Sequence, residues 1–163
     1  MPTKRRSHFS AGRSKAMLLP MAREKSTDLI LRTRLFLESI KNGNSDRDKI
    51  NHLAKICIIS GYIARAGHGR IPAEKFEMVE KELARLLYDA QLNDRWREPN
   101  ALLLQAITDV VNEYDRMLGV VRFELFAQAS EYMEYLLNVA ASRRGDDLGD
   151  LIGPLSCELN LRQ

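Results

Sequence analysis

The chain has 163 residues, of which 45% are hydrophobic and 29% are charged. This length suits one domain with a substantial buried core. No run of about 18 apolar residues occurs that could span a bilayer, so we expect no membrane partner. Cys57 and Cys157 lie far apart and neither belongs to a C-x-x-C pair. We therefore expect two reduced thiols and a cytoplasmic protein.

The net charge of +3 is unevenly distributed along the chain. Residues 1–25 contain seven Lys and Arg side chains but one acid, which gives +6 and leaves −3 for residues 26–163. Such asymmetry is typical of an interaction tail. We interpret residues 1–25 as a basic, flexible N-terminal arm. The body is expected at 26–141, with a C-terminal tail at 142–163 that packs on it.

The pattern of apolar residues predicts helices throughout the body. Apolar positions recur at spacings of three and four, and no strand-like alternation persists. We therefore expect an all-α bundle of four to five helices. The first helix is expected from about Thr27 to Lys41, with Ser26 or Thr27 as its cap and Gly43 in the turn that ends it.

A second helix is expected from Ser45 to about Ala66. Ser45 and Asp48 have the spacing of a capping box, with Asp in place of the usual Glu. The helix is apolar nearly all round from Leu53 onward, which is typical of a buried helix. We place it at the centre of the bundle, with Gly67 ending it.

The third helix is expected to begin near Pro72, which suits a first helical turn. One face of it is apolar, and the other is mostly acidic. The apolar stripe contains Phe76, Val79, Leu83, Leu86, Leu87 and Ala90. An acidic helix is repelled by a phosphate groove, so we reject a helix-turn-helix DNA reader. The Trp96 side chain in the following loop is expected to plug one end of the bundle.

A fourth segment, at about 100–141, is expected to form a single long helix because its apolar seam passes straight through Gly119. Two helices hinged at Gly119 are the alternative. After Gly119 the apolar face widens, and the additional apolar residues are Phe123, Phe126, Met133 and Leu137. Their cover is expected to be either a second chain or apolar residues of this chain. The intramolecular candidates are Leu148, Leu151, Ile152 and Leu155 of the tail, and Met17, Leu18, Leu19 and Met21 of the arm.

Catalytic, metal and cofactor sites are not indicated by any motif. The histidines are scattered, Asp48 and His52 form one isolated i, i+4 pair, and no nucleotide-binding glycine motif or nucleophile motif occurs. We therefore expect no catalytic, metal-binding or cofactor-binding residues and no enzymatic activity. His68 in the turn at 67–72 is interpreted as a loop residue.

The favoured hypothesis is a non-enzymatic helical interaction or regulatory protein that forms a homodimer through Phe123, Phe126, Met133 and Leu137. A different protein partner stays open. The alternative is a nucleic-acid-associated protein whose arm makes weak, sequence-independent phosphate contacts. The residues of that alternative are Lys4, Arg5, Arg6, Arg13 and Lys15. A targeting segment is a further interpretation of the arm, although the arm lacks an apolar helical face.

Overall fold

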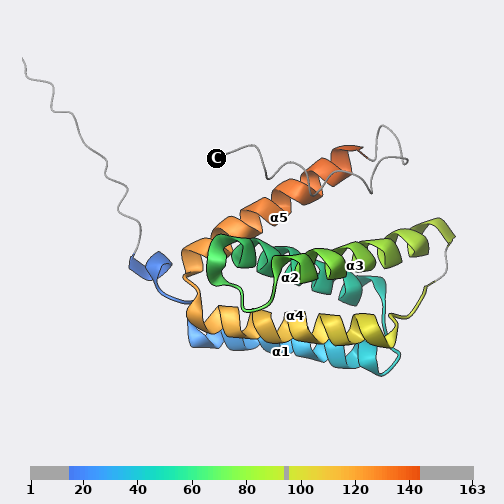
Figure 1. The fold of residues 1–163 in the computed structure, drawn as a ribbon, viewed down its shortest axis with the longest axis horizontal. Helices are drawn as coiled ribbons and strands as arrows, with labels where there is room; N and C mark the ends of the chain where they lie inside the picture. The colour runs from blue at the N-terminus through green and yellow to red at the C-terminus, as the bar shows by residue number, and fades with distance from the viewer. Residues whose placement is uncertain (1–14, 94–95, 144–163) are drawn as a thin grey trace, which may run out of the picture.

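The computed structural model describes residues 15–93 and 96–143, and within them the chain folds as a helical bundle (Figure 1). The expected all-α class is confirmed. The elements are η1 (Lys15–Leu18), α1 (Arg23–Lys41), α2 (Arg47–Ile63), η2 (Ala64–His68), α3 (Ala73–Asn93), α4 (Ala101–Val120) and α5 (Phe123–Arg143). Here η1 is a short 3-10 helix and η2 is one wide helical turn.

The helix α2 lies at the centre of the bundle, as its composition predicts. It contacts all four other α-helices, and Ile50, Leu53 and Ile63 along it are fully buried. Its first turn is capped by Asp46, whose carboxylate accepts the Lys49 backbone N–H at 2.9 Å. The expected cap at Ser45 is therefore wrong by one residue.

The helix α1 begins at Arg23, earlier than the expected start at Thr27. Its N-cap is Ala22, with no side-chain hydrogen bond to the first turn. The Ser26 hydroxyl instead donates to the Arg23 carbonyl at 2.9 Å, so neither expected cap is used. Residues 15–25, assigned to a flexible arm from the sequence, are helical or packed on the bundle, and Met21 contacts its core.

Two glycines shape the passage from α2 to α3, with Gly61 inside α2 and Gly67 in the turn that follows it. Gly67 has φ of 88°, which favours glycine and ends the helical path as expected. Gly61 allows α2 and α3 to pack closely, because a Cβ there would lie 3.2 Å from the Phe76 Cβ. Pro72 stands immediately before α3, and the buried face of α3 includes Phe76, Val79 and Leu83.

The single long helix expected over 100–141 is wrong, because α4 ends at Val120 and α5 begins at Phe123. Val121 is extended, with φ of −91° and ψ of 142°. A distant segment also pairs there: the Phe123 backbone N–H donates to the Leu19 carbonyl at 2.8 Å, and Pro20 forms an isolated antiparallel bridge with Arg122.

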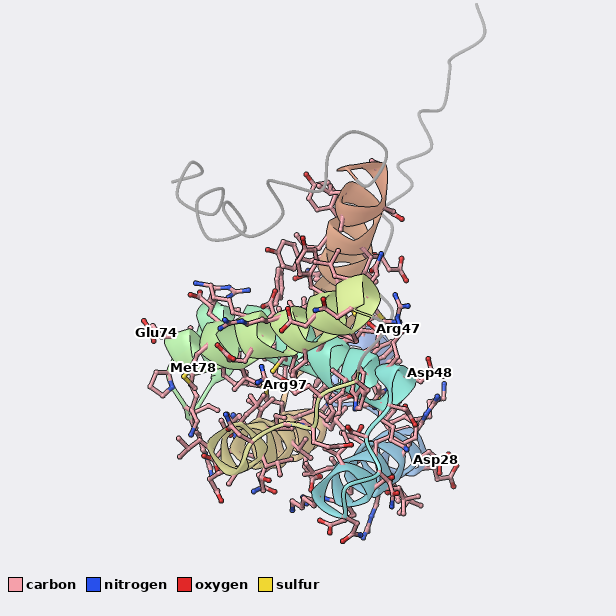
Figure 2. All side chains as sticks on the ribbon, turned by 90° about the vertical axis from the view of Figure 1, so that its right-hand side faces the viewer. Asp28, Arg47, Asp48, Glu74, Met78 and Arg97 are labelled. Carbon is pink, nitrogen blue, oxygen red and sulfur yellow. The ribbon has the colours of Figure 1, made fainter. Side chains whose placement is uncertain are left out.

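At the opposite end of the bundle, Trp96 closes the space between two connections. Its indole N–H donates to the Ser45 hydroxyl, which in turn donates to the Glu98 carboxylate. The ring is half-buried and packs against the core. The predicted plugging role of Trp96 is therefore supported by its position. Figure 2 views the molecule from this side.

Candidate functional site

The helix α5 leaves the bundle partway along its length. Its first turns are anchored, because Phe126 is 4% exposed and Ala129 is fully buried. After Ala129, no described side chain of α5 is buried. Figure 1 shows the same change. The first turns of α5 cross α2, and the rest of α5 points away from the other helices.

The projecting half of α5, residues 130–142, keeps the apolar periodicity of the anchored half. Met133 and Leu136 are half-buried, but they do not contact the main core within the described residues. Leu137 is 40% exposed. An apolar helix face with this much unburied surface is typical of an interaction site.

The four predicted interface residues do not form one surface. Phe126 belongs to the core, where its ring meets the Tyr114 ring edge to face with centroids 6.2 Å apart, so its assignment to a free surface is corrected. Phe123 lies at the junction of α4 and α5 and is 36% exposed. Met133 and Leu137 lie on the projecting half. The structure thus leaves three of the four residues accessible.

The point where α5 crosses α2 is marked by two aromatic rings. Tyr132 of α5 and Tyr62 of α2 have ring centroids 5.2 Å apart. Burial raises the pKa of Tyr132, although the nearby charge of Arg65 lowers it in part. Glu80 of α3 lies in the same region, and its pKa is raised mainly by burial and lowered in part by Arg65. The ring contact places the base of the projecting half against α2.

The junction of α4 and α5 carries a second accessible apolar group. Leu18 and Leu19 are exposed beside Phe123, and Val120 is exposed at the end of α4. A cavity of about 360 Å³ adjoins the junction, lined by His68, Arg122, Glu124, Leu125 and Gln128. Its charged groups are of both signs, so its lining does not single out a ligand.

Among the residues that the structure describes, the most buried charge is Glu113 on α4, which is 5% exposed. Its carboxylate accepts the Arg70 backbone N–H at 2.7 Å and two guanidinium N–H groups of Arg116 at 3.0 and 2.7 Å. Burial alone would raise the pKa of Glu113, but the Arg116 and Arg70 hydrogen bonds outweigh it and lower the pKa. Arg116 also donates to the His68 carbonyl, so this pair fixes the α2–α3 turn on α4.

The i, i+4 spacing of Asp48 and His52 would allow a hydrogen bond between them, but the contacts of the His52 ring are with α1. The His52 Nε2 lies 3.0 Å from the Thr33 hydroxyl oxygen, and its ring meets Phe36 edge to face. Burial, followed by the charges of Arg32 and Lys55, lowers the pKa of His52. These contacts make His52 a packing residue between α1 and α2.

The part of the chain that the structure describes gives little support for a metal site or a reactive thiol. No group of three or more His, Cys, Asp or Glu side chains there could hold a metal ion. Cys57 is a buried free thiol, and burial, with a smaller contribution from Glu80, raises its pKa. A buried thiol with a raised pKa is unreactive. Cys157 lies outside the described residues.

The nucleic-acid alternative falls mostly outside the described residues. Lys4, Arg5, Arg6 and Arg13 are not among them, and Lys15 is exposed at the start of η1. The apolar residues at 148–155, considered as an intramolecular cover, also lie outside. Of the other candidates for that cover, Met17 is half-buried in η1, and η1 contacts α5.

Comparison of the chain with protein-family models, with curated proteins and with solved structures found no match. Among residues 15–93 and 96–143, no helix is both long enough and apolar enough to cross a membrane.

Proposed function

We propose that this protein is a non-enzymatic helical interaction module that forms a homodimer through the projecting half of α5. One observation carries the proposal. The apolar periodicity of α5 continues past Ala129, but the described part of the body stops covering it there. Met133 and Leu137 on this half of α5 are apolar and not fully buried, so a second apolar surface is the partner that they fit.

The hydrophobic effect favours such an association. Fully burying a Leu or Met side chain contributes about 1.5–3 kcal/mol, and a symmetric dimer would bury Met133 and Leu137 twice. One helical face is smaller than a standard stable interface, so we expect a dimer that dissociates in the micromolar range, on the order of −8 kcal/mol in binding free energy.

Other partners fit the same face less specifically. A different protein with an apolar groove would use the same residues, and no charge pattern on α5 singles out such a partner. We propose the second copy because it needs no further component. We also propose a reducing, cytoplasmic setting, which the buried free thiol of Cys57 supports.

The test is the mass in solution of a Met133→Glu, Leu137→Glu variant, measured by sedimentation velocity over a range of concentrations. We expect the unmodified protein to shift from monomer to dimer and the variant to stay monomeric. The helical content should be unchanged, since neither side chain contributes to the core.

A matched control replaces two exposed leucines elsewhere with the same acid. Leu31 and Leu35 on α1 are 55% and 60% exposed, so Leu31→Glu, Leu35→Glu adds the same charge away from α5. This control should dimerise normally. A monomer at every concentration for the unmodified protein, or an α5 variant that still dimerises, would contradict the proposed function.

A further inference from the structure

The segment before α1 and the connection between α4 and α5 together form an exposed apolar surface, which we call the junction patch. The Phe123 backbone N–H donates to the Leu19 carbonyl, and Pro20 forms a bridge with Arg122, so the two segments are held side by side. Figure 1 shows η1 and this connection at the same end of the bundle. The patch consists of Leu18, Leu19, Val120 and Phe123, which are 42%, 57%, 59% and 36% exposed.

The four side chains of the junction patch lie outside the hydrophobic core of the described residues. None of them packs against that core, whereas their neighbours Met21, Val121 and Leu125 belong to it or pack against it. The hydrogen bond that joins the two segments uses backbone atoms, so it leaves the Leu19 and Phe123 side chains available to a partner. A contiguous apolar surface of this kind is typical of an interaction site.

The charge associated with the junction patch is positive. Arg122 lies next to Phe123 in the chain and is exposed. Residues 1–23 contain six Lys and Arg side chains and no Asp or Glu, and Leu18 and Leu19 lie within this range. The chain thus attaches its most basic segment directly to the patch.

A partner that fits this end of the molecule has to accept apolar side chains and attract positive charge. A nucleic-acid duplex would attract the basic residues, but it offers no apolar surface to Leu18, Leu19 and Val120. The surface of an anionic bilayer offers both, because apolar side chains insert about 5–10 Å into its headgroup region and its anionic lipids attract neighbouring Lys and Arg. Stable surface binding requires two such signals together.

We propose that the junction patch docks on the surface of an anionic membrane, with Leu19 and Phe123 inserted at the headgroup level and the basic residues of the segment 1–23 on the anionic headgroups. The expectation of no membrane partner rested on the lack of a spanning segment, and binding at the surface needs none. The contact goes beyond the proposed self-association, which uses the projecting half of α5 at residues 130–142.

Co-sedimentation of the full chain with lipid vesicles tests this docking. We expect the protein to pellet with phosphatidylcholine vesicles that contain about 30% phosphatidylserine, but not with phosphatidylcholine alone, and to be released at high salt. Leu18→Ser, Leu19→Ser should weaken binding by about tenfold or more, because it removes apolar surface that would be inserted. Its helical content should stay unchanged, since neither side chain packs against the core.

A matched control makes the same replacements on α1. Leu31 and Leu35 are 55% and 60% exposed, so Leu31→Ser, Leu35→Ser removes as much exposed apolar surface away from the junction patch and should leave vesicle binding unchanged. Replacing three basic residues of the segment, in Lys4→Gln, Arg5→Gln, Arg6→Gln, should weaken binding to the anionic vesicles.

Fluorescence reports the insertion itself. Trp96 is the single native tryptophan and lies at the opposite end of the bundle, so its emission should not change when anionic vesicles are added. Leu19→Trp adds a tryptophan to the junction patch, and this variant should show a shift to shorter wavelength and quenching by brominated lipids.

Three results would overturn the inference. The first is a full chain that does not bind anionic vesicles at low salt, and the second is a Leu18→Ser, Leu19→Ser variant that binds as tightly as the α1 control. The third is binding of the full chain to duplex DNA but not to vesicles, which would favour the nucleic-acid alternative. Self-association is measured separately by sedimentation, so the proposed function stands or falls independently of these results.

Discussion

Replacing Glu113 by Gln should destabilise the protein by removing one buried charge while preserving the shape of the side chain. The amide oxygen can still accept the Arg70 backbone N–H, which Glu113 Oε1 accepts at 2.7 Å. The amide nitrogen replaces Oε2 and cannot accept from the Arg116 Nε–H, so that bond is lost, and the second Arg116 bond, to Oε1, loses its charge assistance. Each change is worth about 1 kcal/mol. Because the Arg116 side chain is 21% exposed, water should recover part of the loss, and we expect a cost of about 1.5–2 kcal/mol.

Urea unfolding followed by circular dichroism at neutral pH measures this cost. A loss of about 2 kcal/mol corresponds to a decrease in Tm of roughly 4–8 °C for a domain of this size. Glu82→Gln on the exposed face of α3 is the matched control, since Glu82 is solvent-exposed, and it should change stability by less than about 0.5 kcal/mol. An equally small effect of Glu113→Gln would refute the role of the buried pair.

The pH dependence provides a second check with a defined sign. The pKa of Glu113 is lower in the folded state than its ordinary value, so its charge contributes stability above the unfolded pKa of about 4.3. That contribution is lost as the pH falls through the folded pKa. The difference in stability between the unmodified protein and Glu113→Gln should therefore shrink below about pH 4. A difference that stays constant into acid would contradict the assignment.

Four further substitutions compare residues of the same type in different surroundings. Phe126→Ala should cost about 3–5 kcal/mol as a core truncation, whereas Phe123→Ala should cost less than about 1 kcal/mol in the monomer; equal costs in urea unfolding would contradict their separation. Gly119→Ala should stabilise by about 0.5–1 kcal/mol, because Gly119 is helical and a Cβ there meets nothing within 4 Å. Gly67→Ala should destabilise by about 1–2 kcal/mol, since its φ is 88°, and a neutral melting temperature would be the contrary result.

The presence and order of the first three helices could be predicted from the sequence because the turns that follow α1 and α2 are encoded locally. Gly43 and Gly67 both adopt the positive φ that their turns suggested, and the stripe of α3 is buried at Phe76, Val79 and Leu83. The caps were less predictable. Asp46 and Ser45 are both good capping residues, and Ser45 is instead engaged by Trp96 from a distant loop.

The candidate site could be predicted only in outline. The widened apolar face after Gly119 was visible in the sequence, but periodicity alone does not separate Phe126, which is buried, from Leu137, which is exposed. That separation depends on where α5 leaves α2. The role of Glu113 was likewise hidden, because its partner Arg70 comes from a turn 43 positions away.

The break between α4 and α5 connects the fold to the proposed interface. A continuous helix would have kept residues 123–141 in line with α4, whereas the extended Val121 redirects the chain. Starting a new helix leaves its first backbone N–H groups without intrahelical partners, and at the start of α5 the Leu19 carbonyl accepts one of them, from Phe123, at 2.8 Å. The segment that precedes α1 thereby stabilises the direction of α5. The same contact places Leu19 beside Phe123, so the segment before α1 fixes the start of the helix whose projecting half is proposed to dock on a second copy.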